Sequence, residues 1–299
     1  MRDASDPEYS AFVDGLGDGT HVVPQLDAVN GDGLCDPSSA LAPVPAFVGH
    51  TTDVDALIQY VYGDLGDLLS EPAKYRGHAI MCTTNSRVQE FNDAIVQRIQ
   101  PQGMATLRSY DRLDNGEHGS DLHGDVLDML GHRPNVPPHA LTLFPGALCM
   151  VMRNLDVKRG LVNSTKCVVV SIGRNVVAVR PLDRPHAGDP LLVPRITFKQ
   201  RLVKTDKRSP YVRRMQFPLQ LCYGITLNKS QGQTLDRVGI DLRDDSFSHG
   251  HTYVGFGRVR DRDSVMVLVR PSRVAAGIAH VACCLRTRTG TPKSPRCSR

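Results

Sequence analysis

The stretch that decides the fold reads LCYGITLNKSQGQTL over residues 221–235, and YVGFGRVR follows over residues 253–260. In the first stretch an apolar run ends in the polar sequence Asn228-Lys229-Ser230-Gln231-Gly232, and the second stretch carries the arginine Arg258. Because the side chains of Asn228, Lys229 and Ser230 are hydrogen-bond donors at the end of this run, the pattern predicts groups that face phosphate. We predict a helix over residues 219–230 and a shorter helix over residues 249–257.

An α/β pattern surrounds this stretch. Residues 76–85 predict a buried strand that leads into a helix over residues 86–100, with Asn85 or Ser86 as its cap. Further strands are predicted over residues 238–242 and 264–269. In open α/β sheets ligands bind at the carboxyl ends of the strands, which makes Thr83, Thr84 and Asn85 candidates for phosphate contact. A helix cap explains these three residues equally well.

The middle of the chain has a different character. Short β-prone runs over residues 147–152, 166–172 and 175–179 are separated by turn sequences, which predicts a small antiparallel barrel. Because α/β signals resume afterwards, the barrel is predicted to be an insertion. Residues 101–140 are polar and read as a connector. Residues 195–214 hold eight basic residues and one acidic residue, a composition more typical of a solvated hairpin than of a DNA groove.

Charge is strongly segregated along the chain. Residues 1–70 contain 1 basic and 12 acidic residues, residues 71–270 contain 29 basic and 19 acidic, and residues 271–299 contain 6 basic and none acidic. The acidic start predicts a loose leader with one short helix near residues 9–16. A second helix is predicted from Asp53, capped by Thr51 or Thr52. A basic body attracts phosphate, although a solvated surface explains any single patch equally well.

Cysteine spacing and hydropathy limit the class of protein to which the chain can belong. The eight cysteines include no C-x-x-C pair and several lie in apolar runs, so we predict reduced, mostly buried thiols and no metal site. No stretch approaches the roughly 18–20 apolar residues of a membrane span, which predicts a soluble, intracellular protein. Tryptophan is absent and aromatic residues make up 5% of the chain, so base stacking is not expected to dominate nucleic-acid binding.

In chain order, these segments resemble the C-terminal half of the PIF-type superfamily 1 DNA helicases, and most closely the Helitron group of that family. The resemblance covers roughly residues 10–270. Its successive matches are the post-core linker (17–20), motif IV (78–92), the inserted SH3-like barrel (137–165), motif V (226–235, led into by 213–219) and motif VI (253–259, led into by 247–250).

The resemblance implies a RecA-like parallel-sheet domain, the second motor domain, interrupted by a small SH3-like β-barrel. The implied divisions are an acidic leader (1–50), the first part of RecA-like domain 2 (51–136), a 2B-type insertion (137–212), the second part of RecA-like domain 2 (213–270) and a basic disordered tail (271–299).

The same resemblance implies the roles of single residues. Arg258 would be an arginine finger on the γ-phosphate, with Gln231 and Gly232 beside the nucleotide. Six residues would bind single-stranded DNA: Thr83, Thr84, Asn85, Asn228, Lys229 and Ser230. ATP and Mg²⁺ would be held mainly by a first RecA-like domain. The family implies 5′ to 3′ unwinding in replication, repair, recombination, telomere maintenance or transposition, in the nucleus if the organism is eukaryotic.

Two departures from the family pattern leave alternatives open. The sequence has no Gly-Lys dipeptide for a Walker A loop and no Asp-Glu pair for Walker B, so the chain alone is expected not to hydrolyse ATP. Gly255 and Gly257 in the motif VI segment are expected to loosen the element that presents Arg258. Three interpretations are therefore open. The chain is the half of a helicase that senses a nucleotide held by a Walker-A-bearing partner, a non-catalytic DNA-binding module, or a degenerate transposon remnant.

Overall fold

The computed structural model describes residues 6–18, 20, 39–113, 135–183, 189–203, 207–245, 250–275 and 278–284. The chain forms two compact units. The first is built from residues 1–63, 77–88 and 224–299, and the second from residues 64–76 and 89–223. The first unit is thus assembled from three stretches of sequence that the second unit separates.

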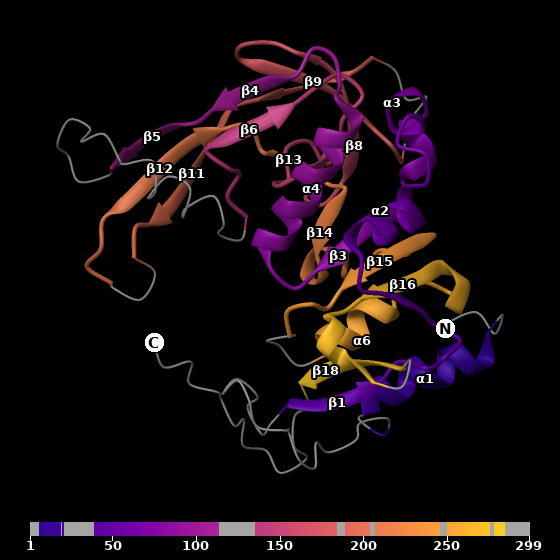
Figure 1. The fold of residues 1–299 in the computed structure, drawn as a ribbon. Helices are drawn as coiled ribbons and strands as arrows, with labels where there is room; N and C mark the ends of the chain where they lie inside the picture. Colours follow the sequence, from indigo (N-terminus) through magenta and orange to yellow (C-terminus); the bar gives the residue numbers. More distant parts are fainter. Residues whose placement is uncertain are drawn as a thin grey trace. The chain divides into compact units, whose positions relative to one another are not determined.

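A five-stranded parallel sheet forms the centre of the first unit (Figure 1). Its strands, in spatial order, are β14 (Gly224–Thr226), β3 (His78–Cys82), β15 (Arg237–Asp241), β16 (Val265–Leu268) and β2 (Gly49–Thr51). β3 and β15 are almost continuously buried, as expected for a parallel sheet covered on its faces. The strands predicted over residues 76–85, 238–242 and 264–269 are confirmed.

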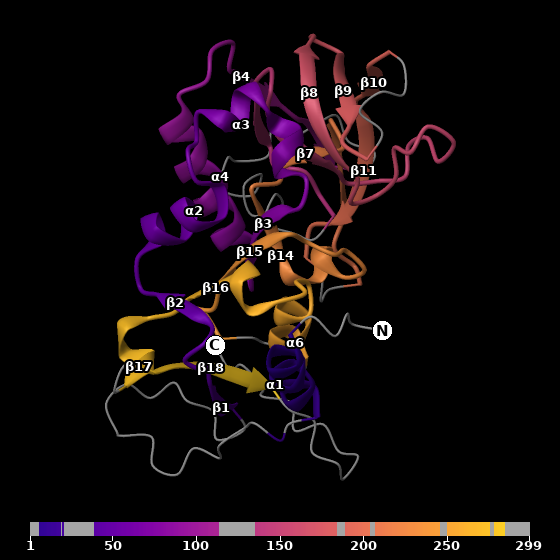
Figure 2. The same cartoon turned by 90° about the vertical axis from the view of Figure 1, so that its right-hand side faces the viewer.

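Helix α2 (Val54–Tyr62) packs on this sheet (Figure 2). Leu57 and Val61 are buried, and a Cβ atom at Gly239 of β15 would lie 3.0 Å from both side chains, so the glycine allows the close approach. The N-cap is Asp53, whose carboxylate accepts from the backbone N of Asp55 at 3.1 Å and of Ala56 at 3.3 Å. The predicted cap at Thr51 or Thr52 was therefore wrong.

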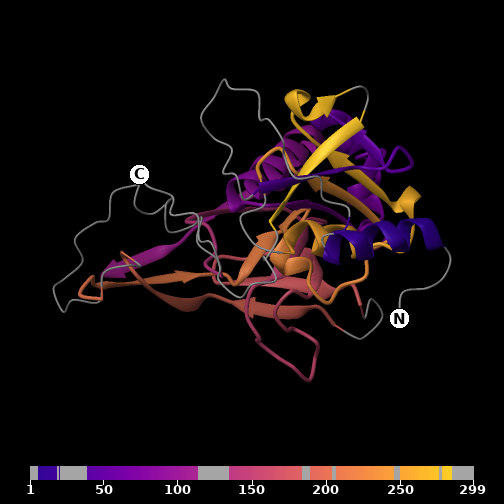
Figure 3. The same cartoon turned by 90° about the horizontal axis from the view of Figure 1, so that it is seen from below.

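Residues from both ends of the sequence complete the first unit. Helix α1 (Pro7–Asp18) confirms the short helix predicted near residues 9–16, and it packs beside helix α6 (His251–Phe256), as Figure 3 shows. β1 (Ser39–Pro43) pairs antiparallel with β18 (Ile278–Cys284), and β17 (Val274–Ala275) pairs with the other edge of β18. The disorder predicted from residue 271 is thus wrong for residues 278–284, since strand pairing orders them.

An antiparallel five-stranded sheet forms much of the second unit. Its strands, in spatial order, are β10 (Leu191–Pro194), β9 (Val176–Pro181), β8 (Lys166–Ile172), β7 (Leu148–Val151) and β13 (Leu219–Leu221). The three β-prone runs of the sequence are confirmed as β7, β8 and β9. Helix α4 (Asn85–Ile99) begins in the first unit and continues in the second, where Phe91 and Ile95 are fully buried.

Two smaller sheets and two short helices complete the second unit. The first sheet consists of β11 (Ile196–Arg201), β12 (Tyr211–Gln216) and β5 (Tyr110–Leu113), and the second of β4 (Ala105–Arg108) and β6 (Ala140–Leu143). The helices are α3 (Asp67–Ser70) and the 3₁₀ turn η1 (Pro72–Tyr75). The interpretation of residues 101–140 as a plain connector was wrong for residues 105–113, because β4 pairs with β6 and β5 pairs with β12. Residues 114–134 lie outside the described residues.

A buried ion pair ties β12 to β5. Arg214 is 1% exposed, and its Nε and Nη2 donate to the two carboxylate oxygens of Asp111 at 2.9 and 3.2 Å. Arg214 Nη1 also donates to the carbonyl oxygen of Pro137, and Asp111 accepts from the Ser109 hydroxyl. Since removing one partner would leave a buried charge, this pair fixes the position of β5 against β12.

Candidate functional site

The stretch at residues 219–230 forms two strands and a turn. The helix predicted there was wrong: β13 pairs with β7, β14 pairs with β3, and only Leu227–Ser230 is helical, as the 3₁₀ turn η2. The apolar residues before Asn228 serve as sheet residues in two different sheets, so strand pairing overrides local helix preference. The polar end of the stretch still follows a strand at the carboxyl edge of the parallel sheet.

The η2 turn presents some of its predicted phosphate-binding groups and buries another. Asn228, Gln231 and Gly232 are exposed and Lys229 is partly exposed. Ser230 is fully buried, and its hydroxyl donates to the Leu227 carbonyl at 2.7 Å, so this side chain stabilises the turn. Gly232 has φ +81°, a left-handed conformation that favours glycine.

Arg258 joins motif VI to this turn. Its Nη1 lies 3.4 Å from the carbonyl oxygen of Ser230 and 3.3 Å from that of Gln233, and its Nε donates to the Val254 carbonyl at 2.9 Å. The backbone N of Leu235 donates to the Arg258 carbonyl at 2.9 Å. Residues that lie about 25 positions apart in the sequence are thus brought together, with the guanidinium directed onto the turn.

His251 forms a second link between the two segments. It is buried at the start of α6, and its Nε2 lies 3.0 Å from Oδ1 of Asn228. Because a carbonyl oxygen only accepts, Nε2 carries the proton. Burial lowers the pKa of His251 below its ordinary value, which favours the neutral ring. Sequence reasoning missed this residue, since a lone histidine ahead of motif VI carries no spacing signal.

Glycine at position 255 has a packing role. A Cβ atom there would lie 3.0 Å from Cδ2 of Leu227 in η2 and 3.3 Å from Cδ1 of Ile240 in β15. The absence of a side chain allows α6 to lie directly against the turn and the sheet. The loosening expected from this glycine is therefore offset by close packing.

Helix α1 supports α6 from the other side. The Tyr9 hydroxyl donates to the Phe256 carbonyl at 2.7 Å, and the Phe12 ring meets the Phe256 ring edge-on at 5.2 Å. A Cβ atom at Gly17 would lie 2.9 Å from the Tyr253 ring. These contacts of helix α1 hold in place helix α6, which precedes Arg258.

The end of β3 forms a helix cap. Thr84 Oγ1 accepts from the backbone N of Arg87 at 3.3 Å, so Thr84 caps α4 in place of the predicted Asn85 or Ser86. Thr83 is 4% exposed and its hydroxyl is turned away from solvent, whereas Thr84 and Asn85 are partly exposed. Of the three predicted contact residues, only the latter two reach the surface.

A small ion network lies near the carboxyl ends of β3 and β15. Arg87 Nε donates to Asp244 Oδ2 at 2.8 Å, and Arg270 Nη2 donates to Oδ1 at 3.1 Å. The hydrogen bond from Arg87 is the main reason that the pKa of Asp244 is lowered.

Within the described residues, no group of three or more His, Cys, Asp or Glu side chains is placed to hold a metal ion. No helix of this part of the chain is long and apolar enough to cross a membrane.

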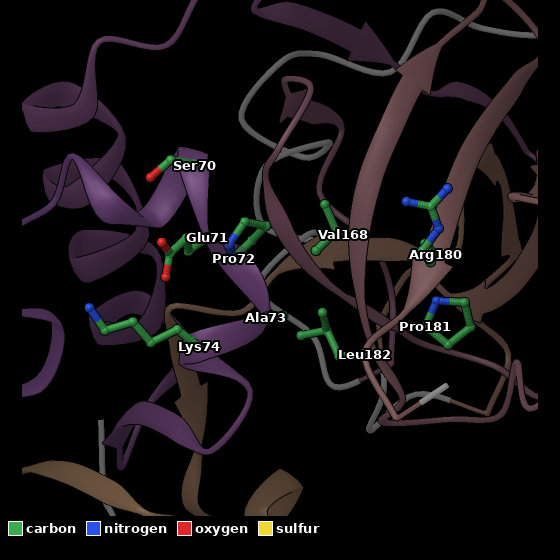
Figure 4. A pocket seen from close by; sticks show the side chains of 9 residues that line it. All are labelled: Ser70, Glu71, Pro72, Ala73, Lys74, Val168, Arg180, Pro181 and Leu182. Atoms are coloured by element: carbon green, nitrogen blue, oxygen red, sulfur yellow. The ribbon is translucent and has the colours of Figure 1, made fainter. Parts of the chain in front are cut away.

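The second unit contains a pocket of about 520 Å³, lined by residues 70–74, Val168 and residues 180–182. Figure 4 shows Pro72 on one side and Val168 and Leu182 on the other, with the Lys74 ammonium directed away. Its lining is mainly apolar, which does not suit a nucleotide phosphate. The motif residues of the first unit therefore remain the candidate site.

Comparison with known proteins finds similarity to DNA helicases of the Pif1 type. Residues 132–172 match the family model of the 2B domain of DNA helicase Pif1. The chain is 35% identical over 192 residues to the ATP-dependent DNA helicase PIF1 of Xenopus laevis, and 37% identical over 131 residues to that of Homo sapiens.

These matches relate the chain to the PIF-type superfamily 1 helicases.

The chain spans less than a third of the length of these curated relatives. The match covers 63% of this chain and 27% of the Xenopus protein, and 43% of this chain and 19% of the human protein. The Pif1 helicase of Candida albicans superposes with a TM-score of 0.53 at 20% identity over 90% of this chain and 55% of that chain. A Bacteroides Pif1 in complex with ADP-AlF3 and ssDNA gives 0.52 at 20% identity over 88% and 49%. These likenesses confirm a RecA-like fold for the parallel sheet.

Proposed function

We propose that this chain is the C-terminal motor and DNA-binding portion of an ATP-dependent DNA helicase, close to the Helitron group. The observation that carries the proposal is the contact between Arg258 and the η2 turn. A motor of this kind must couple a nucleotide-sensing arginine to a DNA-binding loop. Here the two are in direct hydrogen-bonding contact within one unit.

The exposed groups of the turn suit two ligands. Lys229 and Asn228 would donate to a backbone phosphate of single-stranded DNA, as would Thr84 and Asn85 at the end of β3. Gln231 and Gly232 would lie beside the nucleotide, where a glycine in the left-handed conformation admits close backbone approach. Ser230 would act through the shape of the turn, because its hydroxyl is already bonded to Leu227. Thr83 is buried, so we propose that it supports Thr84 and Asn85 and does not itself contact DNA.

Arg258 would act as the arginine finger. Its three hydrogen bonds to carbonyl oxygens hold the guanidinium on the turn, and reaching a γ-phosphate would break the two long ones to Ser230 and Gln233. An incoming phosphate, as a charged acceptor, competes well with neutral carbonyls. The η2 turn would then sense the nucleotide state through the loss of these bonds.

ATP and Mg²⁺ would be held mainly by a first RecA-like domain with a Walker A loop, which is not among these 299 residues. The curated relatives are named as ATP-dependent DNA helicases, and the Bacteroides Pif1 was crystallised with ADP-AlF3 and ssDNA. These names support ATP and single-stranded DNA as the ligands of the assembled motor. We further propose that the antiparallel sheet around residues 137–212 is an SH3-like 2B insertion, and that the protein acts inside the cell, in the nucleus if the organism is eukaryotic.

A non-catalytic single-stranded-DNA-binding module is the second candidate. The hydrogen bonds that Arg258 makes to backbone carbonyls favour this candidate, since an arginine with only a structural role would make the same bonds. A degenerate remnant is less well supported, because Gly255 and Tyr9 pack closely around the motif VI helix.

Adding a Walker-A-bearing PIF-type domain in trans separates these candidates. The helicase proposal expects DNA-stimulated ATP hydrolysis that Arg258→Ala lowers by about 1,000-fold or more. The matched control is Arg174→Ala, an exposed arginine in the turn between β8 and β9. If Arg258→Ala and the parent hydrolyse ATP equally well, Arg258 is not a finger and the binding-module candidate replaces the helicase.

A further inference from the structure

The side chain of Asn228 in the η2 turn is hydrogen-bonded to helix α6. Its Oδ1 lies 3.0 Å from Nε2 of His251, the first residue of the helix, which is only 4% exposed. Asn228 itself is exposed. A buried group on one element therefore holds an exposed polar group on another, and both residues belong to the first unit.

Close packing brings His251 within reach of the turn. Helix α6 lies directly against η2, because Gly255 has no side chain to meet Leu227. The backbone of the turn is itself fixed, since the Ser230 hydroxyl donates to the Leu227 carbonyl at 2.7 Å. With helix and turn both in place, the main freedom left at Asn228 is the rotation of its amide group.

An asparagine amide can offer a ligand either its oxygen or its nitrogen. Here Nε2 of His251 donates to the oxygen of Asn228, so the group left for a ligand is the amide nitrogen, a donor. If the ring instead accepted from the nitrogen, the oxygen would be left, which can only accept. The oxygens of a phosphate diester also only accept hydrogen bonds. The first arrangement therefore attracts a phosphate, and the second repels one.

We propose that His251 is a positioning residue, which holds the amide oxygen of Asn228 so that the amide nitrogen donates to a DNA phosphate. The inference rests on the proposed function, which places Asn228 at the DNA backbone, and it adds the residue that orients this contact. His251 itself touches neither DNA nor nucleotide. Because it lies on the helix that precedes Arg258, it joins that helix to the DNA contact by a route that does not pass through Arg258.

Two substitutions of His251 form a matched pair. His251→Gln places an amide nitrogen the same number of bonds from the backbone as Nε2, so this variant keeps the donor to Asn228. His251→Asn carries the same amide group but stops one bond short, so it loses the donor. Both variants are neutral. Burial lowers the pKa of His251, so the parent ring is neutral as well at pH 7.5, and the comparison involves no change of charge.

The test is binding of fluorescein-labelled dT12 to the full chain at pH 7.5, measured by fluorescence anisotropy across a range of salt concentrations. We expect His251→Gln to keep the Kd within about twofold of the parent, and His251→Asn to raise it about three- to tenfold, as for freeing one ordered side chain. The slope of log K against log salt should stay unchanged, because a neutral donor releases no counterion. A parent-like Kd for His251→Asn, or an equal loss in both variants, would overturn the inference.

Lys229→Gln separates failure of this inference from failure of the proposed function. It removes a cation of the same turn, so it should weaken binding and lower the salt slope by about 0.7. If Lys229→Gln binds dT12 as the parent does, the turn is not a DNA site, and the proposed function and the inference fail together. If Lys229→Gln behaves as expected while His251→Asn equals the parent, only the inference fails.

Asn228→Ala completes the test, because it removes the oriented donor at an exposed position. Its Kd should rise at least as much as that of His251→Asn, and combining the two substitutions should add nothing further. A full additional loss in the double variant would mean that His251 acts through the fold and not through Asn228. Thermal unfolding checks that each variant is folded, and a parent-like Kd for Asn228→Ala would overturn the inference even if the residue 251 variants did not fold.

Discussion

The guanidinium of Arg258 is hydrogen-bonded to the backbone carbonyl of Ser230, 28 residues earlier in the chain. The sequence marked both residues for separate roles, one beside a nucleotide and one beside DNA. If the proposed roles hold, their contact would couple the nucleotide to the DNA through one side chain and one turn. This contact, and other contacts in the chain, can be tested by measurements on the chain alone.

The first prediction concerns the contribution of Arg258 to stability. Arg258→Ala removes bonds from a charged donor to three carbonyls, but two of them are long and the side chain is only partly buried. We expect a loss of about 1 kcal/mol in the free energy of unfolding, below the usual 1.5–3 kcal/mol for such bonds. Urea unfolding measures it, with the exposed Arg260→Ala as the control. An unchanged midpoint would show that the arginine is not anchored on the turn.

The second prediction concerns pH and His251. Burial lowers the folded-state pKa of this ring, so the folded protein stays neutral where the unfolded chain already binds a proton. The stabilisation that comes from keeping the His251 ring neutral is fully present above the unfolded-state pKa of about 6.5. It is lost as the pH falls from there through the folded-state pKa. The melting temperature of the parent should therefore drop more between pH 7.5 and pH 5.5 than that of His251→Gln. A His251→Gln curve parallel to that of the parent would contradict the assignment.

The third prediction concerns the buried pair of Arg214 and Asp111. Arg214→Met or Asp111→Leu alone leaves one buried charge, and we expect each to cost about 3–5 kcal/mol of unfolding free energy. The double variant should cost clearly less than the sum, because it removes both charges together. A double-mutant cycle by urea unfolding measures this coupling. Additive losses would mean that the two side chains do not act as a pair.

The fourth prediction concerns thiol reactivity. Cys149 and Cys167 face each other across β7 and β8, and both are fully buried. Burial raises the pKa of Cys149 well above its ordinary value and that of Cys167 to about 12, so the reactive thiolate is scarce at pH 8. Iodoacetamide should leave the peptides with these two cysteines unmodified in the native protein and alkylate them fully in urea. Mass spectrometry reads out each cysteine separately, and rapid native labelling would show that this sheet opens.

The sequence predicted well where a single pattern determines the structure. Buried strands such as β3 and β15 are short apolar runs bounded by polar residues, and α2 shows helical spacing of its apolar residues, so each was found at nearly its true place. The helix predicted over residues 219–230 failed because its apolar residues pair with two different sheets. No local signal distinguishes such a segment from a buried helix.

The sequence motifs proposed residues for the candidate site but gave no information on their contacts. Lys229 and Arg258 were found from the motifs, but the inward hydroxyl of Ser230, the cap at Thr84 and the link from His251 depend on neighbours far along the chain. The support from Tyr9 is of the same kind, since 247 residues separate the hydroxyl from its acceptor. Long-range hydrogen bonds of this sort leave no spacing pattern to detect.

The pairing of β1 with β18 has a consequence for synthesis on the ribosome. All residues of the second unit have been translated once Tyr223 is made, whereas β1 waits for residues 278–284 before it has a partner. The second unit can therefore acquire its structure while α1 and α2 still present apolar side chains to water. Slow translation between residues 224 and 284 would prolong this exposed stage, and it is the interval in which a nascent chain of this protein would most need a chaperone.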